Sequence, residues 1–384
     1  MRRIVLIILT LSVMTARAEM PVVSPETHAD STITFRLYAP KAHHVKVESD
    51  CLMPDQKDDS WFGGHTRKKK MHKDSTGVWT YTTEPVHPDV YQYRFVVDGW
   101  KIEDPVNPDS TYVVLHKESV VAVGGTEFAD LFTEPADTVA RGRVDTLYVY
   151  SPEQDVTRKV LVYVPPVEQD SFPVLYLMHG ISGDEATWLE VGRVRQVMDH
   201  LLAEGRVRPM IVVMPDCNVP NKLEPKKRTN MLRNAFNFPM IRLGQHFEDA
   251  FPHLYRSVCE HYPISSSQQD HYVAGLSSGA MQAANIARNR PELFGKVGLF
   301  SPARMKEEQF ETHKRGRDAC VPCVESQPTY FIGLGKRDYF YHDGCRFIKR
   351  LENAGLTCTV HETNTAHTWR SWREYLVVFI LSLQ

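Results

Sequence analysis

One serine lies in a sequence pattern that is typical of a nucleophile. Ser277 is the central residue of GLSSG, residues 275–279, which matches the pattern G-x-S-x-G. Residues 271–275 (HYVAG) predict a buried strand before the serine, and the Ala-rich residues 278–289 predict a helix after it. A serine at such a strand-to-helix turn presents its hydroxyl at the edge of a sheet. Because glycine and serine are also common in ordinary turns, the alternative is that Ser277 is only a polar turn residue.

A serine hydroxyl becomes a nucleophile when a base takes its proton, so an acid and a histidine should follow in the chain. Asp338 lies in the loop after the predicted strand 329–334 (TYFIGL), and His367 lies in the loop after the predicted strand 357–363 (TCTVHET). The carboxyl ends of parallel strands meet at one edge of a sheet, where ligands bind in open α/β folds. The sequence therefore predicts Ser277 as the nucleophile, His367 as the base and Asp338 as the acid.

Three other residues compete for these roles. Asp343 is a rival acid and His361 is a rival base, but neither occupies the loop position, and His361 falls inside the predicted last strand. Ser278 is a rival nucleophile that lies one position away from the framed centre. Each predicted triad member, taken alone, is most simply a surface or capping polar residue. The prediction depends on three such residues following three strand ends in the order Ser, acid, His.

Ester hydrolysis through a serine also needs two N–H groups that stabilise the oxyanion. The backbone N–H of Ser278 is the first predicted donor. The second should come from the segment 175–188 (LYLMHGISGDEATW), where we place it at the N–H of Ile181, with Gly180 as the alternative. Such a donor contributes about 3 kcal/mol to transition-state stabilisation. Trp188, at the end of the segment, is a candidate for substrate binding.

The second half of the chain, residues 142–384, alternates between predicted strands and helices. Residues 173–180 and 208–216 are continuous apolar runs, which are typical of strands buried on both faces. Between them, residues 193–204 carry apolar side chains at helical spacing. The other predicted elements are an antiparallel pair at 143–151 and 158–166, strands at 271–275, 296–302, 329–335 and 357–363, and helices at 247–258, 278–289 and 345–355. The pattern predicts an α/β domain with a mostly parallel sheet, of the size of an α/β-hydrolase.

The first half, residues 19–123, carries short alternating runs separated by turn residues. This pattern predicts an all-β, immunoglobulin-like sandwich. Asp98-Gly99 predicts a hairpin turn, because both positions of that turn favour positive φ. Trp79 is expected in the core of the sandwich, since aromatic side chains dominate such cores. Residues 124–141 are polar and rich in Gly, Pro and Asp, and we expect them to link the two domains.

Composition indicates which partners are expected, and the first residues indicate where the protein is located. The chain has 384 residues, 42% hydrophobic residues and a net charge of −2, so nothing in its charge favours nucleic acid or an anionic membrane as a partner. Residues 1–18 combine two arginines, an apolar run and a small-residue site, which predict a secretory signal peptide. The apolar run, residues 4–11, is too short to span a bilayer. We therefore expect an exported, periplasmic or extracellular protein with no membrane span.

The cysteines and histidines do not predict a metal or a cofactor. There are seven cysteines, an odd number that does not suit a disulfide framework. Cys320 and Cys323 form a C-x-x-C pair, for which a local disulfide is the alternative to a metal or redox site. The 17 histidines include no H-E-x-x-H motif. The basic run at residues 67–70 is expected to be a solvated loop, with contact to acidic glycans as the alternative.

The first half resembles the family 48 carbohydrate-binding modules and related early-set sandwiches. The resemblance is carried by residues 35–47 (FRLYAPKAHHVKV) and residues 77–108, which contain YQYRFVVDG and EDPVNP. It covers most of residues 31–110 and implies an ancillary domain of the kind that precedes catalytic domains of glycan-active enzymes. Trp61 and Trp100, which lie beside Gly-rich turns, are the candidates for stacking on sugar rings.

The second half resembles the esterase D-like family, which includes carbohydrate esterase family 1 with its feruloyl and acetylxylan esterases. The matching segments are VLYLMHGISGDEATW, GLSSGAMQA, IGLGKRDYFY and HTWRSWREYL. The resemblance covers nearly all of residues 142–384 and implies Ser277, Asp338 and His367 as the triad, with no cofactor. One departure is that the family's histidine usually follows two glycines, whereas Thr365-Ala366 stand there in this sequence.

An exported chain with these two halves predicts a serine carboxylesterase that cleaves ferulate from plant cell-wall arabinoxylan. A feruloylated or otherwise acylated polysaccharide or oligosaccharide is then the expected partner. The alternatives are an esterase of acetylated xylan or another acyl glycan, an enterobactin-type siderophore esterase, and a catalytically silent glycan-binding protein. The usual cytoplasmic site of the siderophore enzymes conflicts with the predicted signal peptide. The segment 217–242 is expected to shape the pocket, and the oligomeric state is left open.

Overall fold

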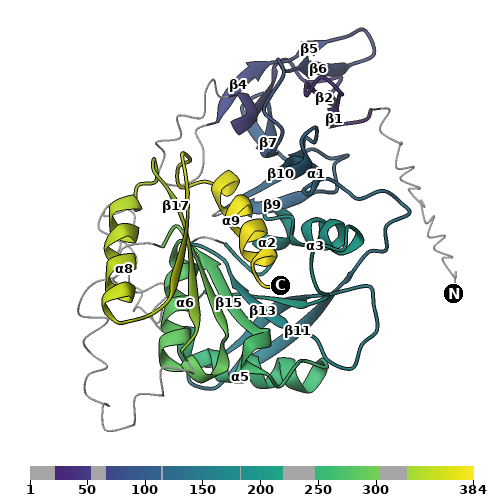
Figure 1. Ribbon diagram of the computed structural model, residues 1–384. Helices are drawn as coiled ribbons and strands as arrows, with labels where there is room; N and C mark the ends of the chain where they lie inside the picture. Colours follow the sequence, from purple (N-terminus) through teal and green to yellow (C-terminus); the bar gives the residue numbers. More distant parts are fainter. Residues whose placement is uncertain (1–21, 53–65, 114–115, 182, 219–246, 303–326) are drawn as a thin grey trace, which may run out of the picture.

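The computed structural model describes residues 22–52, 66–113, 116–181, 183–218, 247–302 and 327–384 (Figure 1). The predicted signal peptide, Trp61, the Cys320–Cys323 pair and most of the segment 217–242 lie outside the described residues.

The first half forms two antiparallel sheets packed face to face. One sheet has the strand order β1 (Glu26–Thr27), β2 (Ile33–Tyr38), β6 (Val78–Thr82) and β5 (His72–Lys73). The other has the order β4 (Arg67–Lys70), β3 (Val45–Ser49), β7 (Val90–Val97), β10 (His116–Ala122) and β9 (Ser110–Val113), with β8 (Trp100–Ile102) paired to β7. Alternate residues of β2, such as Phe35 and Leu37, point into the shared apolar core. Trp79 is 5% exposed in this core, which confirms its predicted place.

The hairpin between β7 and β8 turns at the predicted residues. Asp98 has a φ of 47° and Gly99 a φ of 95°, the two positive values that a tight hairpin turn with the right twist requires. The Asp98 carboxylate also accepts hydrogen bonds from the backbone N–H groups of His43 (3.0 Å) and His44 (2.7 Å). The turn of the hairpin is therefore held to residues 43–44, and Trp100 follows directly after it.

The segment between the two domains is packed against them. It contains the short helix α1 (Glu127–Asp130), and the next two residues, Leu131 and Phe132, are buried. The Glu134 carboxylate accepts a hydrogen bond from Gln196 at 2.5 Å, in a helix of the second domain. Residues 124–141 thus connect the domains, as expected, but as a fixed element and not as a solvated tether.

The second half is built on one eight-stranded sheet with the order β11-β12-β14-β13-β15-β16-β17-β18. Its strands are β11 (Arg143–Ser151), β12 (Val156–Val164), β13 (Val174–Met178), β14 (Ile211–Pro215), β15 (His271–Leu276), β16 (Lys296–Phe300), β17 (Thr329–Gly335) and β18 (Cys358–Thr363). The first two strands are antiparallel to their neighbours, and the other six run parallel. Residues of β13, β14 and β15 are buried throughout, as their continuous apolar runs predict.

Helices cover both faces of this sheet (Figure 1). On one face lie α5 (Phe247–His261), α6 (Ser278–Asn289) and α8 (Tyr341–Asn353). On the other face lie α3 (Val194–Ala203) and α9 (Trp369–Leu381), with the short helix α2 (Thr187–Glu190) beside them. This arrangement confirms the predicted α/β-hydrolase architecture preceded by an all-β domain.

The two domains share apolar core. Val90 and Val120 of the sandwich belong to the same buried cluster as Phe132 of the connecting segment and Trp372 and Leu376 of α9. Figure 1 shows the sandwich seated over α9, α2 and α3, with β9 and β10 nearest to the helices. The interface is therefore continuous with the interior of the hydrolase domain.

Candidate active site

Ser277 occupies a strained turn between β15 and α6. Its φ of 52° and ψ of −113° lie outside the regions that side-chain-bearing residues ordinarily adopt, and its N–H donates to Phe300 O at 2.8 Å. The glycines on either side are sterically required. A Cβ on Gly275 would lie 2.5 Å from the backbone of Gly279, and a Cβ on Gly279 would lie 2.3 Å from His179 O. The turn can form only because both positions lack a side chain.

The three predicted triad residues meet at the carboxyl edge of the sheet. His367 Nε2 lies 3.0 Å from Ser277 Oγ, and His367 Nδ1 lies 2.9 Å from Asp338 Oδ2 and 3.1 Å from Asp338 Oδ1. With its Nδ1–H donated to the carboxylate, the neutral imidazole presents the Nε2 lone pair to the serine hydroxyl. This is the geometry in which a histidine can take the hydroxyl proton.

The surroundings of Asp338 keep it ionised. The side chain of Asp338 is fully buried, and burial raises the pKa of its carboxyl group. The hydrogen bonds and charge of His367, together with the N–H of Phe340, act in the opposite direction. The net result is a pKa below the ordinary value. Phe340 N donates to Asp338 Oδ1 at 2.8 Å. An ionised carboxylate here stabilises the imidazolium that forms when His367 takes a proton.

The loop that carries His367 is closely packed. A Cβ on Gly335 would lie 2.2 Å from Thr365 O, so the end of β17 approaches the loop without space for a side chain. Thr363 Oγ1 lies 2.8 Å from the Tyr375 hydroxyl, and Ser371 Oγ donates to Ala366 O at 2.6 Å. The loop therefore positions the imidazole with Thr365-Ala366 in place of the family's two glycines.

The rival acid, Asp343, and the rival base, His361, form hydrogen bonds elsewhere. His361, in β18, has its Nε2 2.9 Å from Oε1 of Glu374, which lies in α9. Asp343 lies in the first turn of α8 and accepts a hydrogen bond from Arg346. Neither is bonded to Ser277 or to the residues that orient it.

The predicted oxyanion donors belong to two segments, the start of α6 and the loop after β13. Ser278 is the first residue of α6, so its N–H is one of the helix amides that have no partner within the helix. Gly180 packs beside the strand that leads to the serine, because a Cβ on it would lie 2.3 Å from Leu276 Cδ1. Ile181 follows Gly180 in the loop after β13. The two predicted donors thus come from the two segments that adjoin the nucleophile.

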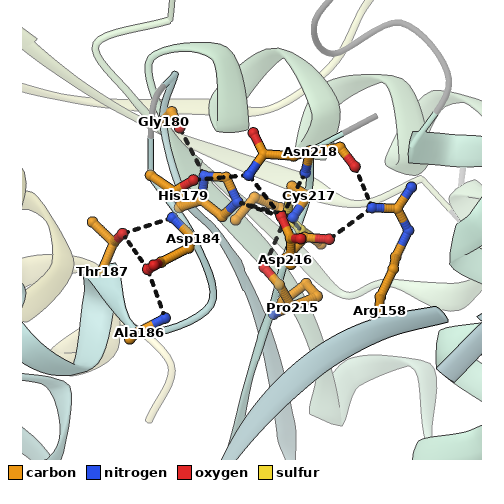
Figure 2. Close-up of polar contacts among 12 residues, drawn as sticks. Arg158, His179, Gly180, Asp184, Ala186, Thr187, Pro215, Asp216, Cys217 and Asn218 are labelled. Atoms are coloured by element: carbon orange, nitrogen blue, oxygen red, sulfur yellow. Dashed lines mark hydrogen bonds and ion pairs between the residues drawn. The ribbon is translucent and has the colours of Figure 1, made fainter. Parts of the chain in front are cut away.

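A buried histidine that the sequence analysis did not assign holds this loop (Figure 2). His179 Nε2 accepts the N–H of Cys217 at 2.9 Å, so Nδ1 carries the proton of the neutral ring and donates it to Gly180 O at 2.7 Å. Asn218 Nδ2 donates to Gly183 O at 2.9 Å from the same side. The loop between β13 and α2 is thereby joined to the end of β14, which no spacing in the sequence indicates.

Trp188 is not available to substrate, and its assignment as a substrate-binding candidate is wrong. Its side chain is 1% exposed, its Nε1–H donates to Met178 O at 2.9 Å, and its ring packs edge-on against Trp369 and Phe300. A side chain that is buried to this extent cannot stack on a ligand. Trp100, by contrast, is 80% exposed in β8 and is free to do so.

Within the described ranges, no three His, Cys, Asp or Glu side chains gather in a way that could hold a metal ion. Cys51, Cys217, Cys259, Cys345 and Cys358 are free thiols. Of the helices in the described part of the chain, none has the length and apolar character to cross a bilayer.

The sheet order, the strained turn at Ser277 and the contacts among Ser277, His367 and Asp338 are those of an α/β-hydrolase. Residues 151–382 match the family described as "Putative esterase", and the chain belongs to that family. Residues 23–109 match "Carbohydrate-binding module 48 (Isoamylase N-terminal domain)". Both matches agree with the resemblances found in the sequence.

A curated relative aligns with nearly the whole chain. A protein of Xylanibacter ruminicola described as "Endo-1,4-beta-xylanase/feruloyl esterase" is 26% identical over an alignment of 377 positions, and the alignment covers 95% of this chain and 46% of the relative. The chain thus spans about half the length of that curated relative.

Two solved structures share the fold. A ferulic acid esterase of Anaeromyces mucronatus, in complex with ferulic acid, is 22% identical with a TM-score of 0.54, covering 66% of this chain and 94% of its own. The enterobactin esterase of Shigella flexneri is 17% identical with a TM-score of 0.57, covering 92% and 93%. At these identities the likeness concerns the fold.

Proposed function

We propose that this protein is an exported carboxylesterase that releases ferulate from arabinoxylan of the plant cell wall. The observation that carries the proposal is the chain of hydrogen bonds from Ser277 through His367 to Asp338 in a member of an esterase family. The curated relative described as a xylanase and feruloyl esterase supports the choice of acyl group and polymer. The predicted signal peptide supports export, which fractionation of an expressing cell would test.

The proposed mechanism uses the chain's own side chains. Ser277 Oγ attacks the ester carbonyl while His367 Nε2 takes the hydroxyl proton, and the N–H groups of Ser278 and Ile181 stabilise the oxyanion. The imidazolium then gives its proton to the departing sugar oxygen, which leaves an acyl group on the serine. His367 next takes a proton from water, the hydroxide attacks the acyl carbonyl, and the proton returns to Ser277 as ferulate leaves. Asp338 stays ionised throughout and orients the ring.

The sandwich supports a glycan as the larger part of the substrate. Residues 23–109 match a carbohydrate-binding module, and Trp100 offers an exposed aromatic ring of the kind that stacks on sugars. We place Trp100 in a sugar contact outside the active site. Trp61 remains a second candidate.

A second candidate function is hydrolysis of a siderophore ester. The enterobactin esterase structure covers 92% of this chain, and therefore both domains, whereas the ferulic acid esterase structure covers 66%. A shared arrangement of domains does not fix the acyl group, so the two functions must be separated by substrate.

Side-by-side acyl profiling tests the proposal. The purified protein is assayed with methyl ferulate, methyl p-coumarate, p-nitrophenyl acetate, acetylated xylan and an enterobactin-type catecholate ester. We expect the highest kcat/KM with the feruloyl ester and release of ferulate from arabinoxylan. A higher kcat/KM for acetylated xylan or the catecholate ester would replace feruloyl specificity with that of the better substrate. Absence of turnover with all five would favour a glycan-binding protein.

A further inference from the structure

Arg373 joins the β-sandwich to the helix that follows the catalytic histidine. It lies in the second turn of α9 and is 1% exposed. Its guanidinium donates to Asp89 Oδ1 from Nη2 at 2.6 Å and from Nε at 3.2 Å, and to Val90 O from Nη2 at 3.0 Å. Nη1 donates to Val191 O, after α2, at 3.0 Å. One arginine thus bridges β7 of the sandwich and two helices of the hydrolase domain.

The residues next to Arg373 hold His367. The ring of Trp372 packs edge-to-face against the imidazole, with 4.9 Å between ring centroids. Ser371 Oγ donates to Ala366 O, directly before the histidine, at 2.6 Å. Three consecutive residues of one helical turn therefore contact the catalytic loop on one side and the sandwich on the other. A movement of this turn would carry His367 with it.

Burial makes the Arg373–Asp89 pair a rigid connection. The side chains are 2% and 8% exposed, so neither charge can move to water without breaking hydrogen bonds and opening the interface. The guanidinium is planar, so it can donate these hydrogen bonds only to acceptors that lie within a narrow range of orientations. The pair consequently fixes both the position of α9 along its axis and its rotation about that axis.

We propose that Arg373 and Asp89 are positioning residues for catalysis, which hold α9 so that Trp372 and Ser371 keep the His367 imidazole aligned between Ser277 and Asp338. The inference rests on the proposed role of His367 as the base. It makes the carbohydrate-module-like sandwich a part of the catalytic structure, because Asp89 and Val90 belong to that domain. Binding of a glycan by the sandwich, proposed above for Trp100, is separate from this positioning role.

A positioning role lowers kcat in the folded protein, whereas a purely structural role lowers only Tm. The variants are Asp89→Ala, Asp89→Asn and Arg373→Lys, assayed with p-nitrophenyl acetate well below each variant's Tm. We expect Asp89→Ala and Arg373→Lys to lower kcat about tenfold to a hundredfold with KM changed by no more than about twofold, because a displaced catalytic group slows the chemical step. Asp89→Asn keeps an acceptor oxygen at the same place and should retain more of kcat than Asp89→Ala.

Arg370→Ala is the matched control. Arg370 lies on the same helix, is half-buried, and contacts the sandwich through a solvent-exposed hydrogen bond between its Nη2 and His87 Nε2 at 3.1 Å. We expect its kcat within about twofold of the wild type, since an exposed contact of this kind fixes little. A kcat in folded Asp89→Ala and Arg373→Lys equal to that of Arg370→Ala, with only Tm lowered, would overturn the inference.

Two further measurements keep the result unambiguous. If Asp89→Ala does not fold, the rate at which a fluorophosphonate labels Ser277 in Asp89→Asn and Arg373→Lys replaces turnover, because that rate also requires an aligned His367. A wild-type rate of labelling in both would contradict positioning. Because p-nitrophenyl acetate demands only an activated serine, a failure of feruloyl specificity leaves this test intact, whereas full turnover by Ser277→Ala would remove both the triad and the inference.

Discussion

The two places where this protein is proposed to touch its substrate are built in opposite ways. The triad consists of side chains from three separate loops that are covered and bonded to one another, with the Asp338 side chain fully buried. Trp100 is a single ring on a hairpin, 80% exposed. Bond cleavage requires groups held in place before the substrate arrives, whereas contact with a polymer requires a surface that the polymer can reach. The difference predicts that changes at the first site affect every substrate and changes at the second affect only large ones.

The largest effect is expected from Ser277→Ala. Removal of the nucleophile should lower kcat about 10⁵-fold or more on small and polymeric esters alike, while far-ultraviolet circular dichroism stays that of the wild type. Ser278→Ala is the control, because Ser278 contributes its backbone and not its hydroxyl. A residual rate of more than about a hundredth of the wild type in Ser277→Ala would show that another residue attacks the ester.

Asp338→Asn comes next. An amide in place of the carboxylate favours the wrong tautomer of His367, and kcat should fall about 10³- to 10⁴-fold with KM nearly unchanged. Asp343→Asn provides the comparison, since this residue pairs with Arg346 and should change kcat by less than about twofold. A greater loss in Asp343→Asn than in Asp338→Asn would mean that the acid is misassigned.

Removal of the sandwich, residues 1–123, is expected to reduce activity on both classes of substrate. Val90 and Val120 belong to the hydrolase-side core and Asp89 holds Arg373, so the shortened protein should have a lower Tm and a kcat with p-nitrophenyl acetate reduced about tenfold or more. The measurement is kcat and Tm of the shortened and the full protein. A wild-type rate on the small ester, with loss only on arabinoxylan, would make the sandwich a binding module alone.

Trp188→Phe tests the revised role of this tryptophan. Loss of the indole N–H leaves Met178 O without its partner, and the free energy of unfolding should fall by about 1–3 kcal/mol. The ratio of kcat/KM for feruloyl and acetyl esters should stay unchanged, because the ring does not reach substrate. A shift in that ratio, measured with the folded variant, would restore Trp188 as a specificity residue.

Trp100→Ala should give the smallest effect. We expect release of ferulate from insoluble arabinoxylan to fall about two- to fivefold at low substrate, methyl ferulate hydrolysis to stay the same, and stability to change by less than about 0.5 kcal/mol. Ile102→Ala, an exposed apolar residue on the same strand, is the control. Equal rates on arabinoxylan for the wild type and Trp100→Ala would exclude Trp100 from glycan binding.

The sequence was sufficient to bring Ser277, His367 and Asp338 to one edge of the sheet, because local rules determine the position of each. Strand ends of a parallel sheet share an edge, and the motif around Ser277 needs a strand before it and a helix after it, so each triad residue could be placed from its own neighbourhood. The hairpin at Asp98-Gly99 and the buried Trp79 followed from equally local patterns. These predictions required no knowledge of how distant segments pack.

What the sequence did not indicate depends on distant contacts. Asp89 and Arg373 are 284 positions apart, and nothing near either residue marks the other as its partner. Trp188 was a candidate for substrate binding, but its ring packs against Trp369 of α9 and is buried. The packing of residues 124–141 likewise depends on Gln196 of α3. Such contacts appear only when the two domains are assembled.

The identity of the acylated residue is the decisive test of Ser277 as the nucleophile. The protein is incubated with methyl ferulate, quenched in acid during turnover and digested, and the peptide that contains residues 273–283 is examined by tandem mass spectrometry. We predict one feruloyl group on Ser277 and none in Ser277→Ala. A feruloyl group on Ser278 or elsewhere in the chain, or turnover by Ser277→Ala with no covalent adduct, would contradict this prediction.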